Sequence, residues 1–212
     1  MEGQNGCDKL KANFTIISFA GVLLILAVFF IVFERRKPKA KEIIPIAVMC
    51  AVASVSRVIF NFMPQVQPVT VIVIIMGACF GKQSGFMTGA LSALVSNMIL
   101  GHGFWTPFQM LAWGIVGFVA GIFADMKLSG SMVFMCIYAF ISALLYGLIA
   151  DFWTIAFMAG ENLTWGIVLS VYSAGFLFNI VHGIGNVVFM IVFYKIFMEK
   201  FERISEKYGV GY

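Results

Sequence analysis

The feature that most constrains this chain is an uninterrupted apolar run close to its N-terminus. The run Phe14–Phe33 (FTIISFAGVLLILAVFFIVF) contains no charged residue, and the basic group Arg35-Arg36-Lys37 follows it. About 20 apolar residues in a helix cross the roughly 30 Å hydrocarbon core of a bilayer. The run is longer than the apolar part of a signal peptide, about 7–15 residues, and no small-residue cleavage site follows it. We therefore predict a transmembrane helix.

The remainder of the chain has the same apolar character. Of 212 residues, 61% are hydrophobic and 11% are charged, and the mean hydropathy is +0.98. Average soluble domains are about 45–50% apolar and about 25% charged. We predict an all-α integral membrane protein, an initial helix plus a six-helix bundle. The six later apolar segments lie at about 43–60, 69–80, 85–100, 107–124, 131–150 and 172–198.

These seven segments divide the chain into three regions. We expect residues 1–41 to form the N-terminal transmembrane helix and a basic cytoplasmic linker, residues 42–198 to form the six-helix core, and residues 199–212 to form a charged cytoplasmic tail. The segment Val69–Phe80 is short for a span, so we expect it to begin near Val66 or to be sheltered by protein.

The distribution of basic residues predicts how the chain is oriented in the membrane. With seven spans, the Arg35–Lys41 loop shares one side with Lys82, Lys127 and the C-terminal tail. The opposite loops, at 61–68, 101–106 and 151–164, contain no Lys or Arg. Because cytoplasmic loops are enriched in Lys and Arg, we predict an outer N-terminus and a cytoplasmic C-terminus. The net charge of +4 is thus a topology signal and does not indicate a nucleic-acid partner.

The sequence holds no recognisable catalytic motif. The two histidines, His102 and His182, are far apart, and no HExxH, nucleophile elbow, Walker A or CxxC pattern occurs. We expect no enzyme activity, no intrinsic cofactor and no metal site. A stripe of small residues, from Gly77 through Gly85 and Gly89 to Ala93, predicts close packing of helices. This stripe could form either a moving interface or a static one.

Polar residues inside spans are costly, so they point to function or to specific pairing. Arg57 lies near the outer end of its span. It could pair with Asp151, with Glu161, with an anion on a ligand, or with lipid headgroups. Asn97, also at an outer end, could bond a ligand or cap a helix.

The segment Gly101–Trp113 combines aromatic and polar side chains around a glycine-bounded loop. His102 and Trp105 lie in its loop, while Gln109 and Trp113 are four residues apart and therefore share one helix face. Apolar walls with a few placed polar groups are typical of a binding site. The alternative is an interfacial aromatic belt beside a capped helix.

The last span carries a polar stripe formed by Asn179, His182 and Asn186. Because lipid cannot satisfy these groups, we expect the stripe to face a cavity or to form interhelical hydrogen bonds. Asp151 and Trp153, in the preceding outer loop, complete the candidate residues of a pocket that opens to the outside.

Four stretches resemble the substrate-binding S-components of energy-coupling factor (ECF) vitamin transporters, most closely those assigned to cobalamin. The stretches are 64–68 (PQVQP), 77–81 (GACFG), 89–97 (GALSALVSN) and 103–110 (GFWTPFQM), within a core of about Glu42–Met198. The resemblance implies a substrate-binding membrane subunit that takes up a vitamin, cobalamin first, from the extracellular side. It implies as partners one membrane coupling subunit and two cytoplasmic ATPases.

The resemblance also implies a surface for the coupling subunit. In that family, an Ala-x-x-x-Ala motif on the first core helix packs against the coupling subunit, and Ala47 and Ala51 match it here. The initial helix Phe14–Phe33 is an addition to the family pattern. Other vitamins or nucleobase-like solutes, a self-sufficient transporter and an intramembrane enzyme remain as alternative functions.

Overall fold

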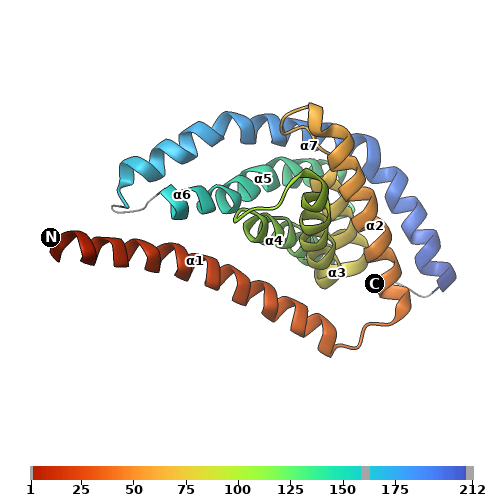
Figure 1. The fold of residues 1–212 in the computed structure, drawn as a ribbon. Coiled ribbons are helices and arrows are strands. Elements are labelled where there is room, and N and C mark those ends of the chain that lie inside the picture. Colours follow the sequence, from red (N-terminus) through yellow and green to blue (C-terminus); the bar gives the residue numbers. More distant parts are fainter. Residues whose placement is uncertain (1, 159–162, 209–212) are drawn as a thin grey trace.

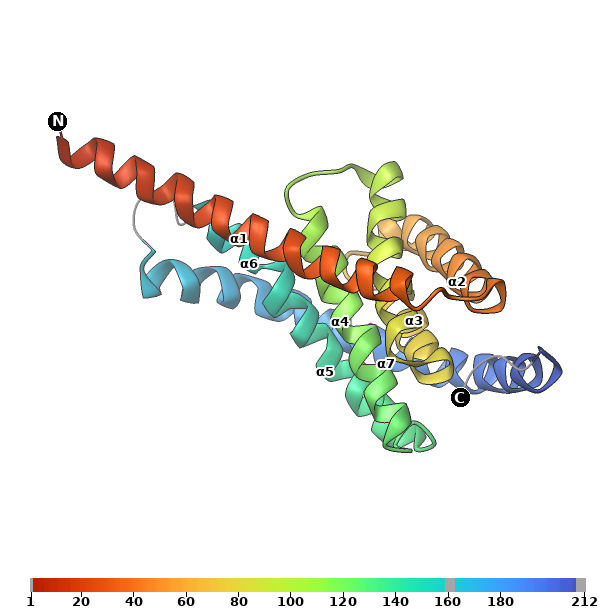
Figure 2. The same ribbon diagram turned by 90° about the horizontal axis from the view of Figure 1, so that it is seen from below.

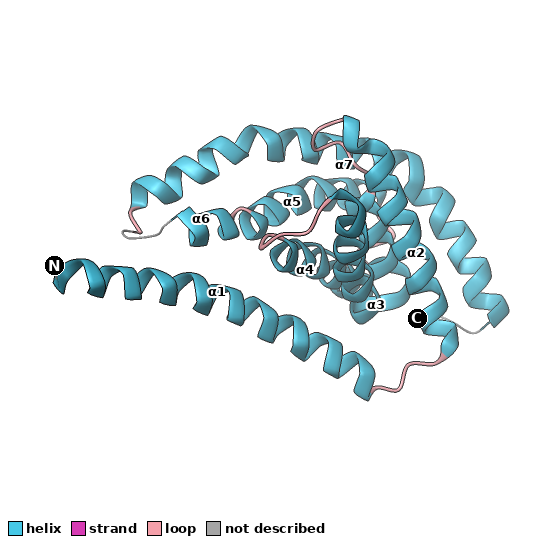
Figure 3. Cartoon of the chain, in the orientation of Figure 1, coloured by secondary structure: helices cyan, strands magenta, loops and turns pink. Residues whose placement is uncertain are grey.

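The computed structural model describes residues 2–158 and 163–208, which form helices and connecting loops without a strand (Figure 3). This confirms the all-α prediction. A short 3₁₀ turn at Phe60–Phe62 precedes the loop that leads to α3. The helices are α1 (Glu2–Arg35), α2 (Ala40–Ile59), α3 (Val69–Leu100), α4 (Thr106–Asp125), α5 (Met132–Ala150), α6 (Phe152–Met158) and α7 (Trp165–Tyr208).

In the described part of the chain, six helical segments are long and apolar enough to cross a membrane. The third of them, α3, is not straight, because Gly81 has φ 84° and ψ 174°. A Cβ placed on Gly85 would lie 2.7 Å from the Cα of Gly77, whereas a continuous helix would separate these two residues by about 12 Å. The chain therefore reverses at Gly81, and α3 supplies two of the seven predicted segments.

The first arm of α3, residues 69–80, is sheltered by protein as the sequence suggested. Val69, Val71 and Val73 are fully buried, as are Ile74 and Met76. At 1.5 Å per residue this arm is about 18 Å long, which is too short to cross the hydrocarbon core. Enclosure by neighbouring helices removes the need for it to span lipid.

Glycines set the distance between α3 and α4. A Cβ on Gly117 would lie 2.3 Å from the carbonyl oxygen of Gly85, and one on Gly89 would lie 2.4 Å from the carbonyl oxygen of Trp113. A Cβ on Gly77 would in turn clash with the carbonyl oxygen of Gly117. Since small residues allow backbones to approach closely, the glycine stripe packs both arms of α3 directly on α4.

The outer helices α1 and α7 lie on opposite sides of this core (Figure 1), and the view from below shows α1 crossing over α4 (Figure 2). α1 contacts α3, α4 and α6. Val22 and Leu26 of α1 are buried, and the ring of Phe29 stacks on Phe86 at 3.8 Å between centroids. The remainder of the membrane-crossing part of α1 is largely exposed to lipid.

Two predicted boundaries were wrong. α7 begins at Trp165 rather than near residue 172. It continues to Tyr208, and Lys195 and Glu199 pair across one of its turns. Apolar residues precede 172, and backbone groups in lipid are satisfied by extending the helix. The loop predicted at 151–164 contains the short helix α6, for the same reason.

The basic loops lie together at one end of the bundle, which we call the basic end. Arg36 donates a hydrogen bond to the Gln83 side chain, and Lys82 pairs with Asp125 at 2.7 Å. Tyr194 of α7 donates to the carbonyl of Ser129 at 2.5 Å. The charge pattern therefore predicted correctly which loops are neighbours. We call the opposite end, where Trp105 and Trp153 meet, the aromatic end.

Candidate ligand-binding site

Side chains of five elements line a partly open cavity of about 100 Å³ at the aromatic end of the bundle. We call it the polar cavity. Its residues come from α2, the loop before α3, α4, α5 and α7, and α1 contributes none. The lining consists of Arg57, Gln65, Gln67, Gln109, Trp113, Tyr146 and His182.

Arg57, in the last turn of α2, is the charged group of this cavity and is only 9% exposed. Its Nη1 donates to Ser96 Oγ and Asn97 Oδ1, both at 2.6 Å, and the guanidinium lies 4.9 Å from the centre of the Trp113 ring. Its Nε has no hydrogen-bond partner among the residues that the structure describes.

From the sequence, Asp151 and Glu161 are possible ion-pair partners of Arg57, and the described structure does not show either pair. Among the described residues no carboxylate lies within ion-pair distance of the guanidinium, Asp151 included. Glu161 lies outside the described residues. Two neutral side chains on the second arm of α3 hold the arginine instead.

Asn97 links Arg57 to α4. Its Nδ2 donates to Gln109 Oε1 at 2.8 Å and to Thr106 Oγ1 at 3.0 Å, while its oxygen accepts from Arg57. The residue is 1% exposed. Asn97 therefore orients the arginine and the glutamine that line the cavity, and it does not line the cavity itself.

Aromatic side chains form a second wall. Trp113 Nε1 donates to Thr70 Oγ1 at 3.0 Å, and this hydroxyl lies 2.9 Å from His182 Nε2. The Tyr146 ring lies 4.6 Å from that of Trp113 and 5.4 Å from that of His182. His182 is 3% exposed, and its Nδ1 has no partner in the described structure.

These two walls suit recognition of a small, flat, polar molecule. Trp113 and Tyr146 form the aromatic part of the lining, beside which a flat ring can pack. Gln65, Gln67 and Gln109 offer amide groups, each able to donate and to accept. A few polar groups placed in a cavity fix the orientation of a ligand. No group of three metal-ligating side chains occurs among the described residues.

Three predicted residues lie beside the polar cavity rather than in its lining. Asp151 and Asn179 pack together between α5 and α7, where Gly147 and Gly175 leave room for them: a Cβ on Gly175 would lie 2.6 Å from Asp151 Oδ2. Asn186 is fully buried and donates to the carbonyl of Ala139 at 3.1 Å. For Asn186, the structure therefore shows an interhelical hydrogen bond, the second of the two alternatives given for the polar stripe.

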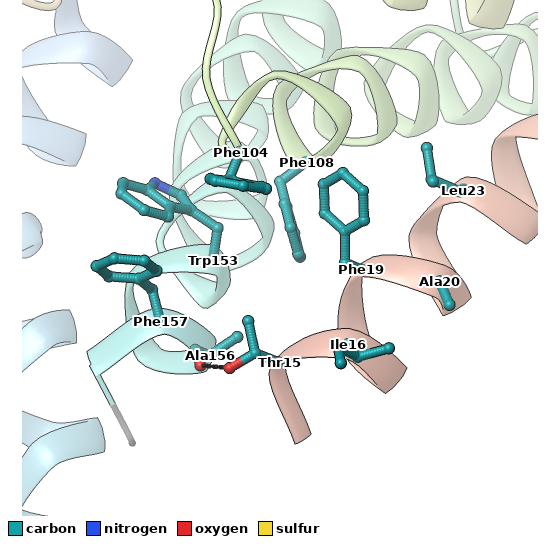
Figure 4. Close-up of a pocket in the computed structure, with 10 residues that line it drawn as sticks. All are labelled: Thr15, Ile16, Phe19, Ala20, Leu23, Phe104, Phe108, Trp153, Ala156 and Phe157. Carbon is teal, nitrogen blue, oxygen red and sulfur yellow. Dashed lines mark hydrogen bonds between the residues drawn. The ribbon is translucent and has the colours of Figure 1, made fainter. Parts of the chain in front are cut away.

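The other predicted aromatic residues lie outside the polar cavity. His102 is exposed, and Trp105 contacts Trp153 at 5.7 Å between ring centres. Trp153 borders a separate apolar groove of about 260 Å³ between α1 and the aromatic end (Figure 4). The one hydroxyl in that groove, on Thr15, donates to the Ala156 carbonyl at 2.7 Å.

Sequence reasoning missed four residues of the site. Gln65 and Gln67 stand between two prolines in a loop that was used for the topology and for the resemblance but not for the site, and two amides in such a loop are a usable signal. Thr70 and Tyr146 lie on strongly apolar helices. Nothing in their spacing separates them from residues that face lipid.

Together, the fold and the cavity define a helical membrane protein with a small polar cavity at one end of its bundle. The family model described as ECF-type riboflavin transporter, S component, matches residues 37–200. The chain belongs to this family of ECF S components. No curated protein and no solved structure gives a significant match.

Membership of this family sets the general function. The chain is a substrate-binding membrane subunit of an ECF-type importer that takes up a vitamin, and it is a transport protein rather than an enzyme. S components work with a transmembrane subunit and ATPases. The matched region begins after the span of α1, which is additional to the family core.

Proposed function

We propose that the polar cavity is the vitamin site and that riboflavin is its first ligand. The observation that carries the proposal is the convergence of Arg57, Gln109, Trp113 and His182 on one cavity in a member of this family. The family description names riboflavin. The flat ring of a flavin can pack against Trp113 and Tyr146. The polar edge of that ring can exchange hydrogen bonds with the glutamine amides.

Cobalamin, which the sequence resemblance favoured, is the second candidate ligand. A cavity of about 100 Å³ is smaller than the roughly 300–1,000 Å³ of pockets that hold drug-sized ligands, so either vitamin requires the cavity to widen. A corrinoid macrocycle is far bulkier than a flavin and would require whole helices to separate. Because riboflavin requires a smaller opening of the bundle than cobalamin does, we favour riboflavin as the ligand.

Binding measurements on purified protein in lipid nanodiscs can decide between riboflavin and cobalamin. Riboflavin is expected to bind with one site per chain and to lose fluorescence as its ring stacks on an aromatic side chain. Calorimetry with cobalamin under the same conditions provides the comparison. Binding of cobalamin without binding of riboflavin would reassign the ligand and leave the cavity in place.

Trp113→Ala is expected to weaken vitamin binding by about thirtyfold or more. This factor corresponds to about 2 kcal/mol, the loss typical of a central aromatic anchor. The matched control is Trp165→Ala, because Trp165 is 81% exposed and lies outside the cavity. Calorimetry gives the affinities, and thermal unfolding verifies that both variants fold. Equal affinity in the two variants would remove Trp113 from the site.

We further propose that the aromatic end faces the outside of the cell. In a chain whose four cysteines are replaced, Leu163→Cys should react with a membrane-impermeant maleimide in intact cells. Lys127→Cys, at the basic end, should react only after permeabilisation. Both positions are exposed. The reverse labelling pattern would place the cavity on the cytoplasmic side and contradict uptake.

The partners that we propose are one coupling transmembrane subunit and two cytoplasmic ATPases. Ala47 and Ala51 are exposed on α2, so small residues form an open strip on which another helix can pack closely. α1 packs against α3, α4 and α6. The additional helix therefore leaves this strip uncovered.

A further inference from the structure

We propose that the solute bound in the polar cavity carries an anionic oxygen group, a carboxylate or a phosphate, which pairs with Arg57. This inference rests on the proposed function and moves its preferred substrate from riboflavin, which is uncharged, to an anionic relative such as riboflavin 5′-phosphate. It concerns one group, the guanidinium at the aromatic end of α2.

The first argument is the uncompensated charge of Arg57. An arginine side chain stays protonated in proteins, and this one is 91% buried, from an exposed fraction of 9%. Buried charges are ordinarily paired with an opposite charge. In the described part of the chain, no carboxylate lies within ion-pair distance of Arg57. An anionic ligand would supply the opposite charge that this buried cation lacks.

The second argument is the way in which the guanidinium is held. Ser96 and Asn97 accept hydrogen bonds from the same nitrogen, Nη1, and the face of Trp113 covers one side of the group. Asn97 is itself fixed by Gln109 and Thr106. The arginine is therefore oriented in advance, and within the described part of the chain its Nε has no partner. Carboxylates and phosphates are the groups that arginine binds in bidentate geometry.

The third argument is the charge of the whole cavity. Besides Arg57, its lining consists of three glutamines, two aromatic residues and His182, and none of these is acidic. The lining therefore carries positive charge with no internal counter-charge. An anion could come from a soluble solute or from a lipid headgroup. Because Arg57 is only 9% exposed and lies between helices rather than on the outer face of the bundle, we assign the anion to the solute.

A matched pair of ligands tests the inference. Calorimetry in phosphatidylcholine nanodiscs should show riboflavin 5′-phosphate binding at least tenfold more tightly than riboflavin. Arg57→Gln should remove this difference, and Arg57→Lys should retain part of it. The control is Lys127→Gln, an exposed cation at the basic end, which should leave both affinities unchanged.

The outcomes separate this inference from the proposed function. If riboflavin binds and its phosphate has no advantage, or if the advantage survives Arg57→Gln, the inference is wrong and the vitamin site stands. If neither flavin binds, riboflavin is wrong as the ligand. Inorganic phosphate then decides: at matched ionic strength it should raise the Tm of the native protein by about 2–4 °C and leave Arg57→Gln unchanged. Absence of this shift overturns the inference.

A comparison of two lipid compositions distinguishes a soluble anion from a lipid headgroup. Nanodiscs that contain phosphatidylglycerol are compared with nanodiscs of phosphatidylcholine alone, for the native protein and for Arg57→Gln. Equal stability in the two lipids supports a soluble anion. A gain from phosphatidylglycerol that requires Arg57, without any effect of phosphate, would assign Arg57 to a headgroup and contradict the proposal.

Discussion

Replacing Gly117 by leucine is expected to abolish folding of the bundle. A Cβ at this position would lie 2.3 Å from the carbonyl oxygen of Gly85 and 2.8 Å from Cγ1 of Val73. Overpacking ordinarily costs about 1–3 kcal/mol because neighbouring side chains move. Here the obstacle is backbone on the facing helix, so α3 and α4 would have to separate. The fraction of protein that elutes as a single species in size-exclusion chromatography measures the effect.

The chain supplies its own control for this experiment. A Cβ added to Gly21, on α1, would meet no atom within 4 Å, so Gly21→Leu should behave as the native protein does. Gly85→Leu should fail as Gly117→Leu does, because its Cβ would lie 2.4 Å from the carbonyl oxygen of Gly117. A folded Gly117→Leu protein that binds its vitamin would show that α3 and α4 do not pack at this distance.

Most of the fold could be predicted from the sequence because lipid leaves few alternatives to a helix. Each apolar run became a helix, and Gly81, followed by polar residues, became the reversal inside α3. The ends were less predictable. The start of α7 at Trp165 and the helix α6 lie where apolar residues continue past the expected boundary, and composition alone does not show where a helix stops.

The candidate site was only partly predictable. Gln109 and Trp113 were placed on one face by their spacing, and both line the polar cavity with His182. Trp105 and Trp153 resembled them in composition but contact each other outside it. Arg57 was recognised as unusual, yet its partners Ser96 and Asn97 are about 40 residues away. Contacts between helices depend on how each helix is rotated, which a single apolar sequence does not record.

Ala47 and Ala51 are expected to matter for transport and not for binding. Replacing both by leucine should reduce vitamin uptake to background in cells that produce the coupling subunit and the ATPases. Both side chains are exposed on α2 and neither lines the polar cavity. Larger side chains would keep a partner helix from approaching closely. Calorimetry on the purified variant should still give the native affinity.

Two further alanines make this result specific. Ala174→Leu places the same bulk at an exposed position on α7 and should leave uptake intact, whereas Ala53 is fully buried, so Ala53→Leu should damage the fold itself. Loss of vitamin binding in the Ala47 and Ala51 variant would mean that this face supports the cavity rather than a partner. Normal uptake would move the coupling surface to another helix. Retained binding with lost uptake is the result expected if the strip on α2 contacts the proposed coupling subunit.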